Sequence, residues 1–400
     1  MNIVFLNTFS SGGGAAIAAN RLKSALEENF SDIVITQLSA SNRSILDKVR
    51  VYLPLALEKG LLKLLLKDKN NLFRFSWALF GQKISNKRVI QEADLIHIHW
   101  INNAFITLKE IEKLKKLGKP LVITLHDMWF FTGGCHYSGS CMGFMSDCRA
   151  CPFLKLQSPA MAQLKAKIDI FNISKTHFIG CSQWISDLAG KSQVANGGDV
   201  VAIPNPIEMR EVDSRTNLKI KYKFTPQETV LIFTSAKLDD KRKGLHHLLM
   251  ALNKRPEKDL TLVLVGDGFE KIEIPEHIKT VNFGFIKDEK KKFELIAMAD
   301  LMVCPSEEDN LPNTVMEALS MGTPVLAFDI GGLSDMVDHG GNGYLAKLKE
   351  ADNGMTDGLD WFLKNRNELD AGKIREKCFE KFSFEAVSAS YMNVYRRALT

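Results

Sequence analysis

Short apolar runs alternate with amphipathic stretches along almost all of the 400 residues, and this repeat restricts the fold more than any other feature of the sequence. The runs are continuous rather than alternating in polarity, which is typical of strands buried on both faces of a parallel sheet. The amphipathic stretches predict helices that cover such a sheet in repeated βαβ units. The runs are NIVFLNT, DIVITQL, DLIHIHW, PLVITLH, THFIGC, DVVAIP, TVLIFTS, LTLVLVG, TVNFGF, DLMVC and TPVLAF, and the predicted helices include 105–118, 243–254, 288–299 and 311–321.

One polar segment interrupts the repeat. Residues 203–228, IPNPIEMREVDSRTNLKIKYKFTPQE, show neither helical nor strand periodicity, and we interpret them as a linker. A chain of 400 residues is too long for one ordinary core and fits two domains of average size. The sequence therefore predicts an α/β protein with two doubly wound domains, at 1–205 and 206–382. Ligands of such sheets bind at the carboxyl ends of the strands, so two facing domains would share a central cleft.

The composition fits a soluble globular protein, with 45% hydrophobic and 25% charged residues. The start, MNIVFLNTFS, lacks the basic region of a signal peptide, and no apolar run approaches the ~18 residues of a membrane span, so we predict a cytoplasmic location. The net charge of +5 gathers in one place, because residues 48–83 hold eight basic and two acidic residues, a net +6. No aromatic-basic motif accompanies this charge, so we predict no nucleic-acid partner.

The loop SSGGGAA follows the first predicted strand and opens a helix. Gly13 and Gly14 would let the backbone approach a ligand, and the helix N-terminus would offer N–H groups to an anion. The pattern is not GxGxxG and lacks the acidic residue of a dinucleotide site, so a nicotinamide cofactor fits poorly. A plain strand-to-helix turn explains the same glycines equally well.

Two lysines lie six residues apart in SAKLDDKRKGLHHLL. Lys237 would end a strand and Lys243 would enter a helix. Two cations that converge in this way suit a diphosphate, whose charge they would neutralise as it leaves. A solvated surface turn is the alternative interpretation.

Two carboxylates lie eight positions apart in SEEDNLPNTVMEAL, between two predicted core strands. Asp309 would end the loop, and Glu317 would lie on the second turn of the next helix. Carboxylates so placed accept hydrogen bonds from sugar hydroxyls, and the loop through Asn310 and Leu311 would present N–H groups to phosphate. An acidic helix N-terminus that only complements the helix dipole is the alternative.

The segment PSEEDNLPNTVMEALSMGTPVLA resembles the E-x7-E segment of retaining glycosyltransferases of the two-domain GT-B type, specifically family 4. The resemblance covers essentially the whole chain and is nearest to bacterial members that build capsule, O-antigen or exopolysaccharide units. It implies two Rossmann-like domains, with the acceptor side in the first, the nucleotide sugar in the second, and the last helix, 383–399, packed back on the first. Further motifs occur in that family's order, namely SGGGAA, LHDMWFFTGGC, GCSQWISD, IPNPI, the Lys237 and Lys243-Gly244 pair, VGDG and IGGLSDMVDHGGNGYLA.

The resemblance also implies roles for the candidate residues. His126 would line the cleft near the transferred sugar, and Lys237 and Lys243 would hold the donor diphosphate. Asp309 and Glu317 take the positions of the two glutamates, which contact sugar hydroxyls and the ribose. Two departures from the family pattern matter, because Asp309 is shorter than Glu and Lys237 lacks the bidentate fork of Arg. Such enzymes need no metal or cofactor for catalysis, and the acceptor attacks on the face that the diphosphate leaves.

The segment TGGCHYSGSCMGFMSDCRACP places Cys135, Cys141, Cys148 and Cys151 within 17 residues. In a cytosolic protein such clustering indicates metal binding before disulfides. Four thiolates could close a structural zinc site, with His136 as a substitute ligand, although the first C-x5-C spacing is loose. Reduced thiols packed in a loop are the alternative.

Residues 48–83 combine their positive charge with Leu, Phe and Trp77. A basic amphipathic helix here would lie on an anionic membrane surface, at the inner face of the plasma membrane. This would suit a polyprenyl-diphosphate-linked acceptor. A core-packed helix pair whose lysines extend to solvent is the alternative.

These observations together predict a retaining hexosyltransferase of bacterial surface polysaccharide synthesis. Its donor would be a nucleotide diphosphate sugar and its acceptor a lipid-linked glycan or an oligosaccharide. A catalytically silent scaffold that binds a sugar nucleotide is an alternative from a different class, and a GT-B epimerase is an alternative enzyme.

Overall fold

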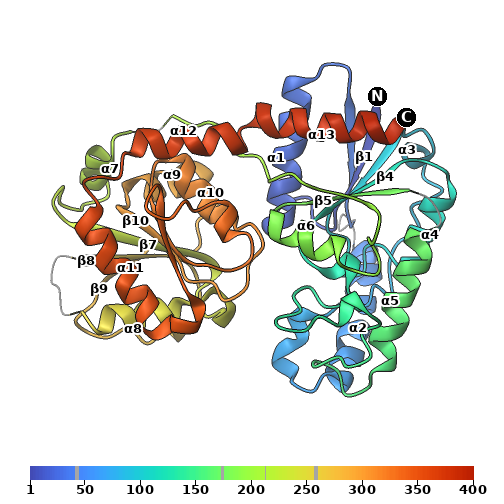
Figure 1. The fold of residues 1–400 in the computed structure, drawn as a ribbon, viewed down its shortest axis with the longest axis horizontal. Helices are drawn as coiled ribbons and strands as arrows, with labels where there is room; N and C mark the ends of the chain where they lie inside the picture. Colours follow the sequence, from blue (N-terminus) through green and yellow to red (C-terminus); the bar gives the residue numbers. More distant parts are fainter. Residues whose placement is uncertain (41–44, 173–174, 212, 256–259) are drawn as a thin grey trace. The chain divides into compact units, whose positions relative to one another are not determined.

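The computed structural model describes residues 1–40, 45–172, 175–211, 213–255 and 260–400. They form two compact units, one made of Met1–Pro206 together with Phe384–Thr400 and the other of Ile207–Ser383. Each unit contains one parallel sheet covered by helices (Figure 1). This confirms the predicted α/β fold with two doubly wound sheets.

The sheet of the first unit has the strand order β2-β1-β3-β4-β5-β6, and all its pairings are parallel. Ile3 pairs with Ile35 on one side and with Leu95 on the other. The central strands are buried over their whole length, as their continuous apolar runs predict. The strands are β1 (Asn2–Leu6), β2 (Val34–Leu38), β3 (Leu95–Ile98), β4 (Leu121–Leu125), β5 (Thr176–Gly180) and β6 (Asp199–Ala202).

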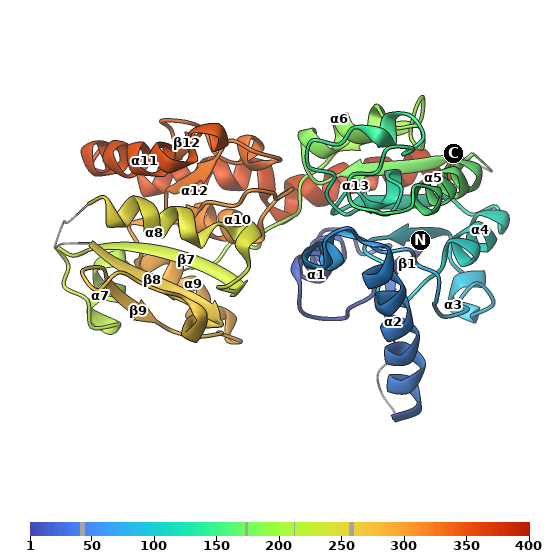
Figure 2. The ribbon, with the colours of Figure 1, turned by 90° about the horizontal axis from the view of Figure 1, so that it is seen from below.

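The last helix, α13 (Phe384–Leu399), packs beside α1 (Gly14–Asn29) in the first unit (Figure 1). Its Tyr391 and Tyr395 are buried in a hydrophobic cluster with residues of β1 and β5. The end of the chain therefore completes the core of the first unit. The other helices of this unit are α2 (Ile45–Leu65), α3 (Arg88–Gln91), α4 (Leu108–Lys116), α5 (Ser158–Phe171) and α6 (Gln183–Gly190), of which α2 extends away from the sheet of its unit (Figure 2).

The sheet of the second unit has the order β12-β11-β10-β7-β8-β9, again with parallel pairings. Leu231 in the middle of this sheet pairs with Leu262 and with Leu301. The strands are β7 (Thr229–Lys237), β8 (Leu260–Asp267), β9 (Lys279–Asn282), β10 (Leu301–Cys304), β11 (Val325–Phe328) and β12 (Gly343–Ala346). The helices are α7 (Arg215–Lys221), α8 (Leu245–Asn253), α9 (Glu289–Met298), α10 (Asn313–Ser320), α11 (Ala351–Asn365) and α12 (Ala371–Phe382).

The segment 203–228, interpreted as a linker, contains a helix, and most of it belongs to the second unit. α7 begins at Ser214, whose side chain accepts a hydrogen bond from the Asn217 N–H, and it buries Leu218. A helix of seven residues makes about two turns, too few to show a periodicity in the sequence. The edge strand β12 was also not predicted from the sequence.

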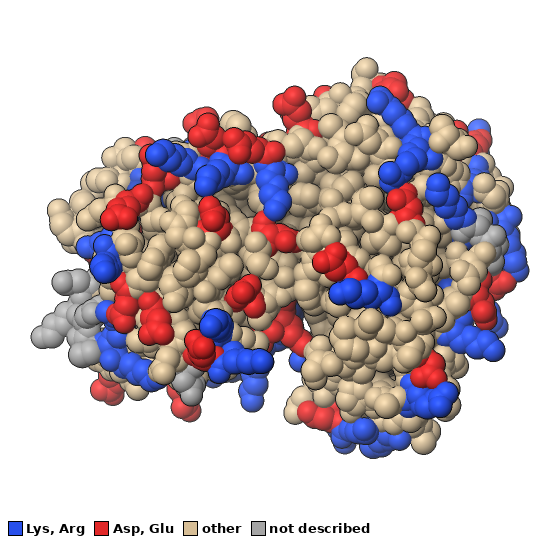
Figure 3. Space-filling view, viewed as in Figure 1, with Lys and Arg blue, Asp and Glu red and all other residues tan. Residues whose placement is uncertain are grey.

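Over the described residues, no helix is long and apolar enough to cross a membrane. On the face shown in Figure 3, basic and acidic side chains alternate over both units. The described part of that face carries no continuous field of one sign.

Candidate functional site

The predicted pair of acid and lysine residues meets at the carboxyl end of β10. Asp309 follows this strand, and its Oδ2 lies 2.5 Å from Nζ of Lys243, which ends the turn before α8. Asp309 is only 8% exposed, so this is a largely desolvated ion pair. The Asn310 N–H donates to the other carboxylate oxygen at 3.1 Å. The structure thus brings together two residues that the sequence places 66 positions apart.

The two loops that carry this pair are in contact along their backbones. The Glu307 N–H donates to the carbonyl of Arg242 at 2.9 Å, and Nη1 of Arg242 donates to the carbonyl of Glu308 at 3.1 Å. A Cβ at Gly244 would lie 1.8 Å from the carbonyl oxygen of Pro305, and φ here is +73°. Only glycine allows both the left-handed conformation and the close approach. The Lys243 turn and the Asp309 loop are therefore fixed relative to each other.

Gly331 holds the same loop from the other side. Its φ is +56°, and a Cβ there would lie 1.8 Å from the carbonyl oxygen of Asp309. Sequence reasoning placed IGGLSD among the family motifs but did not single out this glycine. Its role depends on the approach of a segment 22 residues further along the chain, which no local pattern reveals.

Glu317, the second predicted carboxylate, lies on α10 and is 1% exposed. Its Oε1 is 2.8 Å from Nζ of Lys292 on α9. Lys292 was not predicted as a site residue, because it is one of several lysines in the run DEKKKFELI. The contact of Glu317 with a ribose stays a prediction, and a ligand would meet a carboxylate that already has a lysine partner.

The remaining predicted residues of this unit lie near the same strand ends. Lys237 ends β7 with an exposed side chain. Asn310 and Leu311 are buried in the loop after β10. α10 begins after Pro312, which provides no side-chain hydrogen bond to the first turn. The N-terminus of a helix attracts anions through its N–H groups and dipole, so this position suits a phosphate.

Three residues beside this loop could in principle hold a metal ion. Among the described residues, His246, His247 and Glu307 place their ligand atoms within 4.8 Å of one another, and the imidazole–carboxylate distances are 3.4 and 3.1 Å. Burial, His247 and Lys241 lower the pKa of His246 against the opposing effect of Glu307. Lys241 repels a cation here as well as a proton, so we interpret these residues as an imidazole–carboxylate contact rather than a metal site.

In the first unit, His126 follows β4 and joins a buried network. Its Nε2 is 3.0 Å from Nδ1 of His99, and its Nδ1 is 3.5 Å from Sγ of Cys181. Burial lowers the pKa of His126 to about 4, although Asp127 opposes this change. Burial and the neighbouring histidines also hold the pKa of His99 well below its usual value. His126 is therefore neutral near pH 7 and able to form hydrogen bonds but not to act as a cation.

A second layer connects this strand edge to the end of the chain. His97 contacts the Tyr395 hydroxyl at 2.7 Å through Nδ1 and the Thr124 hydroxyl at 2.8 Å through Nε2. Thr124 in turn contacts the Tyr391 hydroxyl at 3.1 Å. Burial lowers the pKa of His97 and raises that of both tyrosines. All these groups are neutral at pH 7, and none was predicted from the sequence.

Asp127 organises the loop that follows His126. Its Oδ2 accepts hydrogen bonds from Nε1 of Trp100 at 2.8 Å and from Nδ1 of His136 at 2.7 Å. Burial alone would raise the pKa of Asp127, but the His136 ring and the hydrogen bonds hold it below its usual value. Nε2 of His136 lies 3.0 Å from the Ser76 hydroxyl, which completes a Ser-His-Asp arrangement.

These three residues have the hydrogen bonds of a nucleophilic triad, but the serine is too buried to reach a substrate. Ser76 is 8% exposed, and its backbone is fixed by bonds to Gly134, Trp129 and Gln163. A nucleophile must reach a substrate carbonyl beside an oxyanion hole. The chain therefore uses these three residues to connect the 75–78 segment to the Asp127 loop.

The glycine loop after β1 is open. Gly12 and Gly13 have φ values of +78° and +80°, and nothing lies within 4 Å of a Cβ at either position. Gly13 precedes α1, which begins at Gly14 and has no side-chain cap. The glycines are required here by backbone conformation, and the space around Gly12 and Gly13 leaves the backbone accessible to a ligand.

The chain thus has two doubly wound parallel sheets, with polar side chains that can bind a ligand at their strand ends. This arrangement defines a class of fold. The structure of Anabaena Alr3699/HepE in complex with UDP-glucose is similar to this chain with a TM-score of 0.63 and 18% sequence identity, covering 99% of this chain and 100% of that one. At this identity the similarity shows the fold alone. The chain has the GT-B architecture of two Rossmann-like domains.

Residues 216–379 match the family described as Glycosyl transferases group 1. N-acetyl-alpha-D-glucosaminyl L-malate synthase of Bacillus anthracis is 30% identical over 207 residues, which are 49% of this chain and 53% of that protein. The Escherichia coli K12 glycosyl transferase WcaC, named for colanic acid biosynthesis, is 27% identical over 285 residues, which are 64% of this chain and 66% of that protein. The matches thus span about half to two thirds of these relatives. The second unit thus matches a glycosyl transferases group 1 domain, and the chain as a whole has a GT-B fold.

Proposed function

We propose that this chain is a retaining glycosyltransferase that moves a hexosyl group from a nucleotide diphosphate sugar to a lipid-linked or oligosaccharide acceptor, in the synthesis of a bacterial surface polysaccharide. The observation that carries the proposal is the buried pair of Lys243 and Asp309 at the carboxyl end of β10, inside a glycosyl transferases group 1 domain. The relative named for colanic acid biosynthesis supports the polysaccharide role.

The chemistry follows from the two partners of this pair. A diphosphate that arrives at the Lys243 turn competes with Asp309 for the ammonium, and the N-terminus of α10 adds a second attraction for negative charge. Asp309 is then left to accept a hydrogen bond from a sugar hydroxyl. The acceptor hydroxyl forms its bond to the anomeric carbon as the bond to the diphosphate breaks, and its proton passes to a phosphate oxygen. Lys243 stabilises the charge that develops on the leaving group.

The donor base is supported by one comparison. The similar structure of Alr3699/HepE holds UDP-glucose, so we expect a uridine diphosphate sugar here as well. His126 is neutral, so it suits a sugar hydroxyl better than a phosphate, but a hydroxyl would have to replace its contact with His99 or Cys181. Its place near the transferred sugar stays a prediction.

The first test is the thermal stability of the purified chain with UDP, GDP, ADP, CMP or dTDP, without added metal. A ligand that binds only the folded state raises stability by about 2.7 kcal/mol at a hundred times its Kd. We expect a clear rise in Tm with UDP, followed by sugar transfer when UDP-hexoses are supplied with lipid-linked glycans. No rise with any nucleotide up to the millimolar range would contradict the donor site.

The same assay separates the two alternatives. Binding of a nucleotide without turnover, over a broad set of donors and acceptors, would favour a silent scaffold. Conversion of the donor sugar to its epimer without any acceptor would favour an epimerase. The departures at Asp309 and Lys237 from the family pattern are the reason to test both.

We further propose that α2 attaches the protein to an anionic membrane surface, where a lipid-linked acceptor would lie. Leu53, Leu57, Leu61 and Leu64 recur at helical spacing, and each is between 42% and 71% exposed. Such a row forms one continuous apolar face. Lys59, Lys63 and Lys67 are exposed on and just after the same helix and would meet anionic headgroups.

The opposite face of α2 is packed against its own unit, so the exposure of the leucine row is confined to one side of the helix. Glu58 and Leu62 on this face, and Leu66 just after the helix, are at most 3% exposed. The Glu58 carboxylate accepts hydrogen bonds from the N–H groups of Trp77 and Ala78 at 2.9 and 3.2 Å. One side of the helix is thus held in the unit while the other side presents its leucines.

The membrane proposal is tested by flotation of the full chain with vesicles of phosphatidylcholine, with and without phosphatidylglycerol. We expect binding to the anionic vesicles that weakens with salt and is lost in a Leu57→Ser, Leu61→Ser variant. Ile220→Ser, at a residue that is 60% exposed in the second unit, is the matched control. Equal flotation of both variants and the wild type would contradict the proposal.

A further inference from the structure

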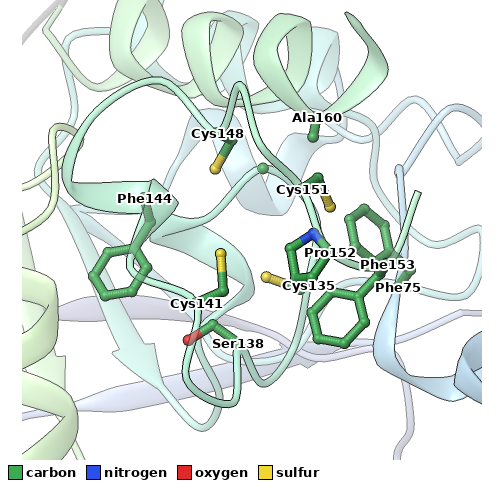
Figure 4. Close-up of a pocket in the computed structure, with 11 residues that line it drawn as sticks. Phe75, Cys135, Ser138, Cys141, Phe144, Cys148, Cys151, Pro152, Phe153 and Ala160 are labelled. Carbon is green, nitrogen blue, oxygen red and sulfur yellow. The ribbon is translucent and has the colours of Figure 1, made fainter. Parts of the chain in front are cut away.

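Four cysteines that the proposed function does not use surround one small cavity in the first unit. Cys135, Cys141, Cys148 and Cys151 line a space of about 20 Å³, together with apolar side chains that include Phe75, Phe144 and Phe153. Figure 4 shows their sulfur atoms around a common interior, with the aromatic rings outside them. A space of this size accommodates about one water-sized group. None of the four forms a disulfide.

Backbone N–H groups point to the sulfur atoms, as they do where thiolates are held. The Gly143 N–H, two residues after Cys141, lies 3.4 Å from its Sγ. The sulfur of Cys151 accepts from the N–H groups two and three residues later, and that of Cys148 accepts from the Gly133 N–H. Hydrogen bonds of this kind stabilise the charged form of an acid.

The backbone of the loop is adapted to bring the cysteines together. Cys148 has a φ of +55°, a left-handed conformation that is uncommon for any residue with a side chain. A Cβ at Gly143 would lie 3.5 Å from Sγ of Cys141 and 3.8 Å from Sγ of Cys148. Position 143 therefore lies directly beside the sulfur atoms of these two cysteines.

The charge of a metal–thiolate centre has a counterpart close by. Lys167 is fully buried on α5, and its Nζ donates to the carbonyl of Thr132 at 2.9 Å and to that of Trp129. The Lys167 amine interacts electrostatically with both Cys135 and Cys148. A divalent ion with four thiolates would carry a net charge of −2, which would favour the protonated form of this amine beside it.

We propose that the four cysteines form a structural zinc site. Zn²⁺ prefers four thiolates in tetrahedral order, and the four thiols would release their protons to solvent as the metal–sulfur bonds form. No three of the four sulfurs yet lie within 4.8 Å of one another, so binding requires the thiols to turn inward. Rotation of one cysteine between staggered χ1 positions moves its sulfur by ~3 Å, which is sufficient.

His136, which the sequence offered as a substitute ligand, is excluded from this set. Its Nδ1 is bonded to Asp127 and its Nε2 to Ser76. Both ring nitrogens are therefore occupied in holding the loop after β4. The zinc site and the Asp127 network lie at successive positions of the same loop and would stabilise each other.

The site would also hold the segment that carries α2. Leu66 pairs with Leu154, and Phe75 pairs with Cys135, as isolated antiparallel bridges. The Lys67 N–H donates to the carbonyl of Phe153 at 2.9 Å, and the Lys155 N–H donates to that of Leu65 at 2.8 Å. These contacts hold the C-terminal end of α2 against the cysteine loop. Closing this loop with a metal would fix the orientation of α2 in its unit.

The test is the metal content of the full chain, purified without chelators and measured by inductively coupled plasma mass spectrometry. We expect about one Zn²⁺ per chain in the wild type, and none in Cys148→Ser or Cys151→Ser. Cys378→Ser, at a buried cysteine of the second unit, is the matched control and should keep the metal. Donor binding by the second unit should persist in all of these variants, which separates this result from a failure of the proposed function.

A second measurement, made on the wild type, tests the site even where the cysteine variants do not fold. In the wild type, a strong chelator should lower the Tm and make the four thiols reactive to a thiol reagent, and added Zn²⁺ should reverse both changes. A metal-free wild type whose thiols stay equally reactive with and without added Zn²⁺ would overturn the proposal. A disulfide between any two of the four cysteines in the purified chain, found by mass spectrometry after alkylation, would overturn it as well.

Discussion

The two units differ in how they bury the polar side chains near their strand ends. In the second unit the buried acids are charged and paired with lysines, Asp309 with Lys243 and Glu317 with Lys292. In the first unit the histidines and hydroxyls beside β3 and β4 are neutral, such as His97 with Tyr395, and the buried Asp127 pairs with a histidine rather than a lysine. A charged pair can exchange its partner for a charged ligand, whereas a neutral network resists ionisation. This difference leads us to expect anion binding at the Lys243 turn of the second unit and neutral hydrogen bonding near His126 in the first.

The largest expected effect comes from removing one charge of a buried pair. Glu317→Ala leaves the Lys292 ammonium without its carboxylate in a largely buried place, and breaking such a pair costs about 3–5 kcal/mol. We expect the free energy of unfolding, measured with urea, to fall by about this amount. Glu376→Ala, at an exposed position of α12, is the control and should change stability little. Equal free energies of unfolding for the two variants would mean that the ion pair of Glu317 with Lys292 does not stabilise the fold.

Breaking the Lys243–Asp309 pair should affect function as well as stability, because Asp309 is buried without its cation in such a variant. Lys243→Ala removes the cation that we place on the diphosphate, so we expect kcat to fall by about 10²–10³-fold. Nucleotide affinity, measured by calorimetry, should fall in parallel. Lys241→Ala, on the exposed side of the same turn, tests whether local charge alone is responsible. Similar losses in both variants would remove the special role of Lys243.

The neutral network of the first unit predicts a dependence of stability on pH. The pKa of His126 is lowered from 6.5 to about 4, so the unfolded chain binds a proton near pH 6.5 that the folded chain does not bind until about pH 4. Stability therefore falls as the pH is lowered from 7, by about 2 kcal/mol at pH 5 from this residue. Urea unfolding at pH 7, 6 and 5 measures the slope.

A matched variant assigns that slope to the network. His126→Gln should unfold with a shallower dependence on pH, and part of the slope should persist because His97 and His99 are shifted in the same direction. An unchanged slope would show that His126 accepts a proton in the folded state.

The smallest effect is expected at the open glycine loop. Gly12→Ala forces a left-handed conformation on a residue with a side chain, which costs about 1–2 kcal/mol, but nothing lies in the way of the added methyl group. We expect a fall in Tm of a few degrees and a folded protein. Gly244→Ala, whose methyl group would collide with the Pro305 carbonyl, should be distinctly less stable. Thermal unfolding of both variants compares the two loops.

The candidate site could be predicted from the sequence only in part. Asp309, Lys243 and His126 could be singled out because each lies in a motif next to a predicted strand end. Their partners could not be found in this way. Lys292 is one lysine among several in its helix, and Tyr395 is 298 residues from the histidine that it contacts.

The sequence by itself determined the two doubly wound parallel sheets, because the length and polarity of most strands and helices are local properties of the chain, the short α7 and the edge strand β12 being the exceptions. Strand ends in a parallel sheet meet at one edge, so the loops of the site were also determined. Only the tertiary structure decided which side chain each site residue contacts and which face of α2 is buried. Those contacts arise when segments far apart in the sequence pack together, and a local pattern contains no information about its distant neighbour.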